Sequence, residues 1–416
     1  NMKKDLKFEE IPLKKPSYKA IEKKVIKLTS DLKSAKNAKE GLKGLKPLGG
    51  TSDAPKHANS FIGGMINLIY MAASQFAGAI AVPEFLCYFD HFLRGDYGDD
   101  YYKRLDKVLY KTVDKEKVEE HPKLAKVFPW AFKSKVTLRH IIEDWCQQLI
   151  HSINEPAGAR NYQSPFTNIA YFDKYYFNSI FEDFVFPDGD IPKWESTKEL
   201  QKLFMKWFNK ERTHEILTFP VETANILVED GKYKDEEMAD FFAEMWAEGH
   251  SFFMYQSDSV DALASCCRLR NAVEDNVFSY TLGAGGIQTG SKAVITINLN
   301  RNVQQWYRDG MTVPLSDYIA DITRRVHKYL TAWNEKLWDD KKSGMLPIFD
   351  AGFIDLDKQY LTVGVSGFTE AAEFLGRHNV EGYEGIEVSP HNEMYKKFAA
   401  DILGTIKQVN TEERTE

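Results

Sequence analysis

The chain has 416 residues, enough for one large α/β domain or two smaller ones, and its 43% hydrophobic and 28% charged residues are typical of a globular protein. The net charge of −7 argues against a nucleic-acid scaffold, although lysines gather in the first 50 positions. Four cysteines without a CxxC pair predict neither a disulfide framework nor a metal site, so we expect a reducing, cytoplasmic setting.

Residues 1–50 form a lysine-rich segment, which favours a peripheral region with one or two exposed helices between residues 21 and 42. The N-terminus shows no signal peptide. The uncharged run from Ala58 to Pro83 is long enough to span a membrane, but polar residues are spread through it and would face lipid at a cost. We therefore predict a helix buried inside the protein, and no membrane partner.

The next segments alternate between helix and strand patterns. A helix is expected from Glu84 to about Leu93, with Cys87 packed, and an amphipathic helix over 137–153, with Cys146 beside its apolar face. A loop over residues 155–167 leads into a strand from Asn168 to Phe172. Residues 215–228 form another strand-like run, in which Pro220 suggests a bulge or a strand end. A helix over 235–248 follows.

Residues Ser251 to Arg270 combine a strand with two neighbouring thiols. The apolar run from Phe252 to Tyr255 predicts a buried strand, and Cys266 and Cys267 follow it. Vicinal cysteines rarely pair with each other because the ring that would close is strained. One thiol can therefore face a cavity while the other packs. The residues alone leave open whether these cysteines are catalytic or inert core residues.

The rest of the chain continues the alternation. The glycine-rich loop over 282–292 lacks the spacing of a dinucleotide or phosphate-binding loop. Ala293 to Leu299 is predicted to be a fully buried strand. The longest helix is expected over 315–338, with Ser316 as its cap. A strand over 360–366 and helices over 369–375 and 392–409 complete the pattern. This alternation predicts an α/β protein whose sheet or barrel is covered by helices.

Seven segments occur together in one order along residues 50–376. They are SDAPKHANSFIG at 52–63, QFAGAIAVPEFLCYFDHF at 75–92, NYQSPFTNIAYF at 161–172, LTFPVET at 217–223, SCCRLR at 265–270, TGSKAVITINLNR at 289–301 and GVSGFTEAAEFLG at 364–376. The ordered set resembles the catalytic subunit of anaerobic (class III, glycyl-radical) ribonucleotide reductases.

This resemblance implies a ten-stranded α/β barrel, made of two five-stranded parallel halves, over residues 51–416. A finger loop inside it would carry the cysteine that becomes a thiyl radical, and that cysteine maps to Cys267, next to Arg268. The radical would abstract the ribose 3′-hydrogen, after which the 2′-hydroxyl leaves as water. The substrate side chains implied by the matched motifs are Gln163, Ser164, Thr167, Asn168, Ser291, His57 and Asn59.

The sequence departs from the family in four places. Another active-site cysteine is expected upstream, but residues 25–50 contain none, and Thr29 and Ser30 lie near its position. The family's INLPR reads INLNR, with Asn300 in place of proline. No ATP-cone-like sequence precedes residue 50. The phosphate-binding loop, the four-cysteine zinc site and the glycyl-radical loop of the family are not found.

The resemblance therefore implies that no cofactor is held in this chain. It implies a glycyl radical on a separate C-terminal segment, generated by a radical-SAM 4Fe–4S activase, and zinc in that segment. Ribonucleotide substrate, ATP or dNTP effectors and a homodimer are also implied. Two alternatives stay open: a glycyl-radical enzyme with another substrate, and a non-catalytic nucleotide-binding or assembly subunit. The reductant, formate or a thiol system, is left open as well.

Overall fold

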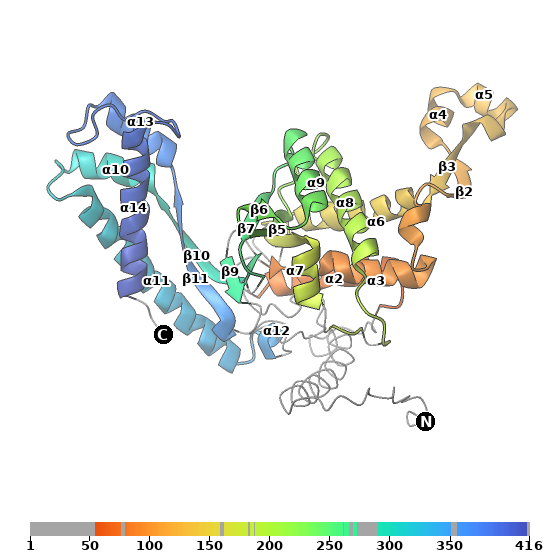
Figure 1. Cartoon of the computed structure of the whole chain (residues 1–416), viewed down its shortest axis with the longest axis horizontal. Helices are drawn as coiled ribbons and strands as arrows, with labels where there is room; N and C mark the ends of the chain where they lie inside the picture. Colours follow the sequence, from red (N-terminus) through yellow and green to blue (C-terminus); the bar gives the residue numbers. More distant parts are fainter. Residues whose placement is uncertain are drawn as a thin grey trace.

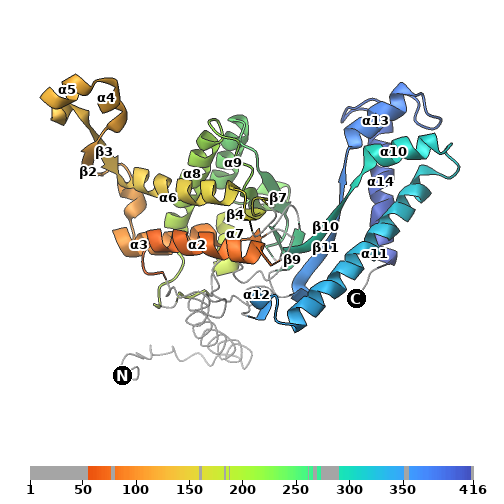
Figure 2. The ribbon, with the colours of Figure 1, turned by 180° about the vertical axis from the view of Figure 1, so that it is seen from behind.

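The structure is a computed structural model. It describes residues 55–75, 80–158, 162–181, 184–186, 188–260, 262–265, 269–272, 290–350 and 356–413. The helices expected between residues 21 and 42 and most of the glycine-rich loop lie outside these ranges. The described chain folds around two hydrophobic cores. Figures 1 and 2 show them as a larger unit, coloured orange to green, and a smaller unit, coloured teal to blue.

The larger unit contains a parallel sheet with strand order β1-β4-β5-β7. Strand β6 pairs antiparallel with the end of β5. The bounds are β1 Ile80–Ala81, β4 Thr167–Phe172, β5 Val221–Glu229, β6 Lys232–Tyr233 and β7 Phe253–Ser257. Its helices are α2 Ala58–Ala73, α3 Phe85–Tyr97, α6 Leu138–Asn154, α7 Lys174–Phe181, α8 Trp194–Glu211 and α9 Glu236–Ala247, and a 3-10 helix spans Tyr101–Arg104.

Periodic burial explains why these helices form. In α6 the buried positions recur every three or four residues, and the Thr137 hydroxyl accepts a hydrogen bond from the backbone N–H of His140 to cap the first turn. The predicted amphipathic helix is thereby confirmed. Helix α2 is buried as predicted but ends at Ala73. Cys87 and Cys146 are both buried, as expected of packing thiols. Among the described helices, none has the length and apolar character needed to cross a membrane.

The smaller unit is built on two long parallel strands. Strands β10 Gly290–Asn298 and β11 Gln359–Ser366 pair along their whole lengths, and helices α10 Leu299–Arg308, α11 Leu315–Lys342, α13 Phe368–Arg377 and α14 Glu393–Glu412 complete this unit. Gly367, with φ +81°, starts α13, and a Cβ there would lie 3.1 Å from the Cβ of Asn300. Helix α11 continues into the larger core through Leu337, near α12 Pro347–Asp350 and the 3-10 helix Leu356–Lys358.

An arm of residues 107–136 projects from the larger unit (Figure 1). It consists of β2 Val108–Val113, α4 Lys115–Glu120, α5 Pro122–Val127, the 3-10 helix Pro129–Phe132 and β3 Lys133–Thr137, and β2 pairs antiparallel with β3. Every residue of β2 is exposed, and α4 and α5 contain no buried residue. The sequence patterns gave no prediction for this arm.

Three expectations need correction. Ser316 is not the cap of α11, because Pro314 occupies the N-cap position and no side chain caps the helix. The strand at 293–299 is not fully buried, since Val294 is 54% exposed. In β7, Phe253 is 40% exposed, and β5 is the only partner of this strand among the described strands. The described strands form a parallel sheet and separate pairs and do not close a ten-stranded barrel.

Candidate active site

The two faces of the parallel sheet differ in chemistry. Ile169 lies beside Glu222 and Ala170 beside Thr223 in the β4–β5 register. Because side chains alternate along a strand, Asn168, Thr223 and Asn225 share one face with Ala170 and Phe172. Tyr171 is on the other face, where its ring contacts Phe204 of α8 and Phe242 of α9. Helices α8 and α9 therefore cover one face, and the buried side chains of Asn168, Thr223 and Asn225 lie on the other.

The polar face is held together by side-chain amides. The Asn168 amide donates to the Thr223 hydroxyl at 3.1 Å and to the Val221 carbonyl at 2.8 Å. The Asn225 amide donates to the Tyr171 carbonyl at 3.3 Å. Asn168, Thr223 and Asn225 are each at most 1% exposed. The sequence prediction included Asn168 but missed Thr223, whose only signal was its place in the LTFPVET run.

A short hairpin approaches this polar face. Strands β8 Ala262–Ser265 and β9 Leu269–Ala272 pair antiparallel, with Ser265 opposite Leu269, and β8 lies against both β4 and β5. The hairpin thus contacts the two strands that carry the buried polar side chains. Residues 266–268, which include the predicted Cys267, come between these strands in the sequence and lie outside the described residues.

The loop before β4 places Gln163 and Ser164 differently. The Ser164 hydroxyl donates to the Asn154 carbonyl at 2.7 Å, whereas the Gln163 side chain is exposed. The Asn154 amide in turn pairs with both backbone groups of Phe219, at 2.9 and 2.6 Å. Asn154, which the sequence prediction missed, thus ties this loop to the start of β5.

The remaining predicted residues lie apart from this cluster. Thr167 is buried on the opposite face of β4 from Asn168, and its hydroxyl has no hydrogen-bond partner among the described residues. His57 and Asn59 lie at the start of α2, about 24 Å of helix away from the end that leads to β1. There the His57 Nδ1 is 2.6 Å from a carboxylate oxygen of Asp96. The described geometry therefore brings neither to the polar face.

Ser291 lies at the start of β10 in the smaller unit. Its hydroxyl bonds to the Thr362 hydroxyl at 2.9 Å and to the Ala293 carbonyl at 3.1 Å, next to an irregularity in the β10–β11 pairing. Lys292 is also buried, and its ammonium donates to the Leu356 carbonyl at 3.1 Å. Burial lowers the pKa of Lys292 from its ordinary value. The start of β10 thus carries two buried polar side chains, Ser291 and Lys292.

The departure at Asn300 has a structural explanation. Asn300 is in the first turn of α10, whose N-cap is Asn298. Backbone N–H groups in a first turn have no helical partner, so proline and asparagine are both tolerated there. The substitution changes no described site contact; its side chain accepts a bond from Gln304 at 2.9 Å.

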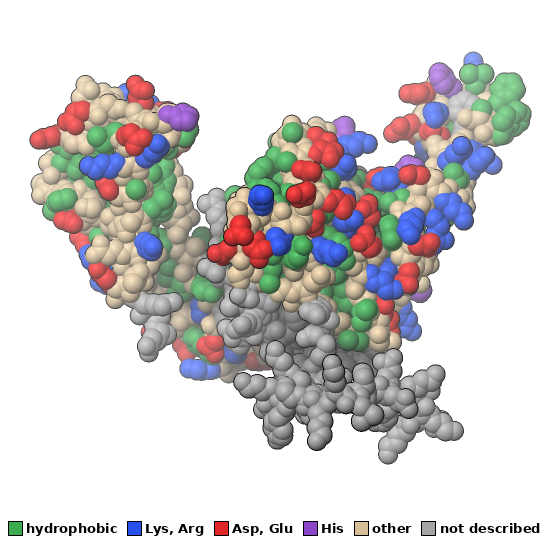
Figure 3. Space-filling model, in the orientation of Figure 1, with side chains coloured by type: hydrophobic (Ala, Val, Ile, Leu, Met, Phe, Trp, Pro, Cys, Tyr) green, Lys and Arg blue, Asp and Glu red, His purple; other side chains and the backbone are tan. Residues whose placement is uncertain are grey.

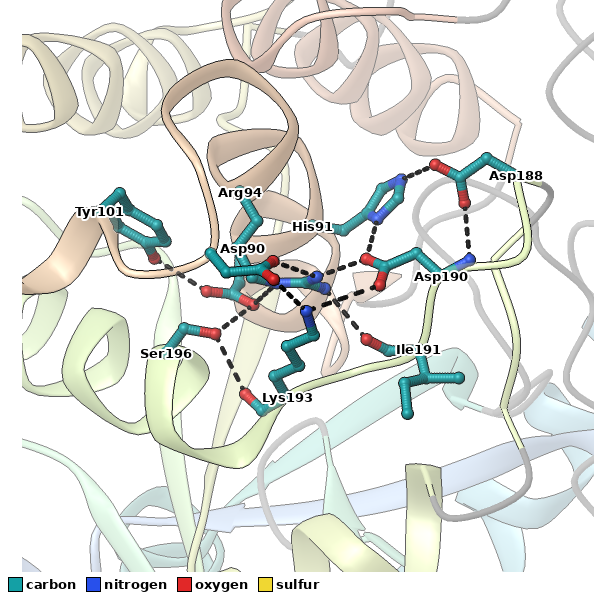
Figure 4. Close-up of polar contacts among 10 residues, drawn as sticks. Asp90, His91, Arg94, Tyr101, Asp188, Asp190, Ile191, Lys193 and Ser196 are labelled. Carbon is teal, nitrogen blue, oxygen red and sulfur yellow. Dashed lines mark hydrogen bonds and ion pairs between the residues drawn. The ribbon is translucent and has the colours of Figure 1, made fainter.

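A buried charge cluster fixes the loop before α8 (Figure 4). The Asp90 carboxylate accepts hydrogen bonds at 2.9 Å from Arg94, Tyr101 and Ser196. Arg94 also bonds to Asp190 and, at 3.1 Å, to the Ile191 carbonyl. Burial raises the pKa of Asp90, while the Arg94 charge opposes that rise. Every polar group of Asp90 has a partner within the fold, so this cluster is a structural clamp between α3, the loop and α8.

The described part of the chain contains no grouped set of metal ligands, and its two cysteines are buried. No three histidine, cysteine, aspartate or glutamate side chains there are grouped to hold a metal ion. Burial raises the pKa of the Cys87 and Cys146 thiols, which keeps both protonated. Neither thiol is therefore a candidate nucleophile.

Comparison with known proteins identifies the family. Residues 39–416 match the family of anaerobic ribonucleoside-triphosphate reductases. The chain belongs to this family. The crystal structure of the anaerobic ribonucleotide reductase from Thermotoga maritima in complex with dATP and CTP is 26% identical, with a TM-score of 0.58, and the match covers 87% of this chain and 54% of that one.

Other reductase structures match in the same way. The Thermotoga maritima enzyme with citrate in the active site is 29% identical (TM-score 0.59; 87% of this chain and 58% of that one). A further anaerobic ribonucleotide reductase is 25% identical (TM-score 0.61; 90% and 52%). The chain thus spans little more than half the length of these relatives. A search of curated proteins found no match.

Proposed function

We propose that this chain carries the thiyl-radical site of an anaerobic ribonucleotide reductase and takes part in reducing ribonucleotides to deoxyribonucleotides. The observation that supports the proposal most directly is the hairpin β8–β9 against the buried polar face of β4 and β5. Cys267 comes between its two strands in the sequence, in a chain that belongs to the reductase family over residues 39–416. A radical needs shielding from water and stray hydrogen donors, and we propose that this thiol occupies such a shielded position.

The chemistry assigns a role to each element of the site. The Cys267 thiyl takes the ribose 3′-hydrogen and becomes a thiol, leaving a carbon radical at C3′. The 2′-hydroxyl then leaves as water after gaining a proton, and a reductant, formate or a thiol system, supplies two electrons and the hydrogen that C2′ gains. The Cys267 thiol finally returns its hydrogen to C3′, which restores the thiyl radical. Gln163, Ser164, Asn168 and Ser291 are proposed to bind the substrate. Thr167, His57 and Asn59 are proposed for substrate binding on the motif resemblance alone, because the described geometry separates them from the polar face.

The complete enzyme is proposed to close a ten-stranded barrel. The parallel strands β1, β4, β5 and β7 would belong to one half and the parallel pair β10–β11 to the other. The glycyl radical, the zinc site and the contact with a radical-SAM 4Fe–4S activase are proposed to belong to a segment outside these residues. ATP and dNTP effectors and a cytoplasmic location are part of the same proposal.

The test replaces Cys267 in a reconstituted system. The chain is combined anaerobically with a glycyl-radical segment of the family and its activase, and deoxynucleotide formation is measured. Cys267→Ser is expected to abolish turnover while nucleotide affinity changes less than about twofold, because serine cannot form the required radical. Cys266→Ser is the matched control.

Two results would contradict this assignment. Loss of turnover in Cys266→Ser alone would show that the neighbouring thiol is the radical site. Absence of deoxynucleotide from the unaltered chain, with ribonucleotide still bound, would favour a non-catalytic nucleotide-binding or assembly subunit.

A homodimer is also proposed, with the arm as its contact. Large apolar side chains on the arm are at least 40% exposed, namely Val108, Leu109, Tyr110, Val113, Leu124, Val127, Phe128 and Trp130. Figure 3 shows hydrophobic side chains gathered at its tip. A two-stranded ribbon without a core of its own is marginally stable and gains from a partner surface. The arm has eight lysines and four acidic residues, hence +4 against −7 for the whole chain, so an acidic second copy is complementary.

Trp130→Glu tests the dimer. Trp130 is 69% exposed and contacts Phe128, so a charge there is expected to weaken self-association at least about tenfold, as for an aromatic hot spot. Analytical ultracentrifugation measures the dissociation constant. Trp333→Glu, on exposed α11, is the control and should leave it unchanged. A monomeric unaltered chain, or equal effects of both variants, would refute the arm as the contact.

A further inference from the structure

Glu222 is a fully buried charge at the start of β5. Its side chain has no solvent exposure, yet three groups from three different elements converge on it. The Tyr171 hydroxyl of β4 donates to one carboxylate oxygen, and Arg212, after α8, donates to the other at 2.8 Å. The His250 Nε2, after α9, lies 3.0 and 2.9 Å from the two oxygens. Burial and the Glu222 charge raise the pKa of Tyr171, which keeps its hydroxyl a donor.

Arg212 uses its whole guanidinium to join two strand starts. Beyond Glu222, it donates to the carbonyls of Leu217 and Pro220, at 3.2 and 3.3 Å, just before β5. It also donates to the Ser251 carbonyl, at 3.1 Å, just before β7. The guanidinium lies 4.0 Å from the ring centre of Phe208, which restricts its orientation. One side chain therefore fixes the positions at which two neighbouring parallel strands begin.

The hydrogen bonds of His250 fix the direction of its ring. Its Nε2 faces the Glu222 carboxylate, and its Nδ1 is 3.1 Å from Asn209 Oδ1. The Asn209 amide is oriented by its nitrogen, which donates to Glu248 at 3.4 Å. Both ring nitrogens thus face acceptor oxygens, an arrangement that suits the doubly protonated ring. The rings of Phe208 and Phe252 pack around the imidazole.

We infer that Glu222, Arg212 and the His250 imidazolium form a positioning network for the thiyl hairpin. The network sets the starts of β5 and β7, β7 leads directly into β8, and β8 lies against β4 and β5. The Tyr176 hydroxyl, bonded to the Ser259 carbonyl at 3.0 Å, supports the connection between β7 and β8. None of these side chains is assigned to substrate. The consequence for catalysis rests on the proposed function, but the positioning itself does not.

Charge explains why such a network specifies geometry. A buried ion pair contributes little to stability compared with well-packed apolar residues, because both charges must be desolvated. It does penalise every arrangement that leaves a charge unpaired. A carboxylate shared by two cations therefore favours one alignment of β4, β5 and β7. A small misalignment of a reacting group can cost on the order of a hundredfold in rate.

Hydrogen–deuterium exchange measured by mass spectrometry tests the positioning without any enzymatic assay. The variants are Glu222→Gln, His250→Gln and Arg212→Lys, the last of which keeps the charge but not the fork. Each is expected to raise exchange at least about tenfold in peptides covering 251–272, with exchange in α2 and α6 unchanged. Glu229→Gln is the matched control: it makes the same change at the exposed end of β5, where Glu229 pairs with Lys234.

Several outcomes would overturn the inference. Unchanged exchange over 251–272 in both Glu222→Gln and His250→Gln would do so. Exchange in Arg212→Lys equal to that of the unaltered chain would also do so. A rise in exchange in α2 and α6 equal to that over 251–272 would show that the network only stabilises the fold as a whole. If Glu222→Gln does not fold, His250→Gln and Arg212→Lys decide the matter, because both leave the Glu222 carboxylate in place.

Turnover in the reconstituted system separates this inference from the proposed function. The variants are expected to lose at least about tenfold in kcat with KM within about twofold. If the unaltered chain reduces no nucleotide, the proposed function fails while the exchange result stands. NMR of ring-¹⁵N-labelled histidine, assigned with His250→Gln, should show both His250 nitrogens protonated at pH 7.5. A neutral ring would contradict the charge assignment.

Discussion

Glu84 and Asp90 are two buried carboxyl groups of α3 and its N-cap that meet different surroundings. Three donors surround Asp90, whereas one Glu84 oxygen has no hydrogen-bond partner in the part of the chain that the structure describes. Burial raises the pKa of Glu84 from its ordinary 4.5 to about 8. A protonated, neutral Glu84 is therefore the form that the native state favours at neutral pH.

Glu84→Gln should stabilise the fold in a pH-dependent way. Because the native state binds the Glu84 proton more tightly than the unfolded state, native stability falls as the pH rises from 4.5 to about 8. The neutral glutamine removes this loss. It is expected to raise the free energy of unfolding by up to about 3 kcal/mol at pH 7 and by almost nothing at pH 4. Urea unfolding at several pH values measures it.

Asp90→Asn serves as the comparison for that experiment. It should destabilise the fold, because Arg94 loses a charged acceptor inside the protein. A gain from Glu84→Gln that is equal at pH 4 and pH 8 would exclude an ionisable, buried Glu84 as its cause.

At the scale of elements, helix starts differ in how they are capped. The Asn392 side chain accepts a hydrogen bond from the Tyr395 backbone N–H at 2.8 Å at the start of α14. Helix α11 has no such bond, and Ser316 lies inside its first turn.

Asn392→Ala is expected to cost about 1 kcal/mol of stability, because it leaves an N–H of the first turn without its acceptor. Ser316→Ala should change the free energy of unfolding by less than about 0.5 kcal/mol. Denaturant unfolding followed by circular dichroism compares the two. Equal losses would restore Ser316 as a cap.

These elements also show what the sequence could predict. Helices over 138–154 and 393–412 follow from apolar periodicity, which is a local property. The exposure of Val294 was missed, because a run of apolar residues does not reveal which face has a partner. The arm was missed because its short, exposed elements bury nothing and so leave no periodic pattern.

The site was only partly predictable for a similar reason. Motif resemblance pointed to Asn168, yet its bond to Thr223 depends on the register of two strands about fifty residues apart. The contact between Glu222 and His250 depends on the same register and on α9. No spacing rule in the sequence encodes such meetings. The prediction for Cys267 stays a prediction.

At the scale of the whole molecule, the two cores are separate groups of side chains. Phe398 belongs to the smaller core and Phe242 to the larger, and both are almost fully buried. Domains with their own cores often unfold as separate units.

Calorimetry should therefore show two transitions. Phe398→Ala is expected to remove about 3–5 kcal/mol from one of them, because the lost ring leaves a cavity. Phe242→Ala should lower the other by a similar amount, and so acts as the reciprocal control. A single transition that both variants shift equally would show one cooperative unit.

Helix α11 has a mechanical consequence. Its residues Leu315 to Leu330 pack in the smaller core and Leu337 in the larger, so one rod of about 42 Å is clamped at both ends. A tilt of roughly 5° about Leu337 would move the Leu315 end, about 33 Å away, by about 3 Å. Strand β10, which rests on this rod, would move with it and take Ser291 along. A small change in the angle of α11 at Leu337 would therefore change the distance between β4, which carries Asn168, and β10, which carries Ser291.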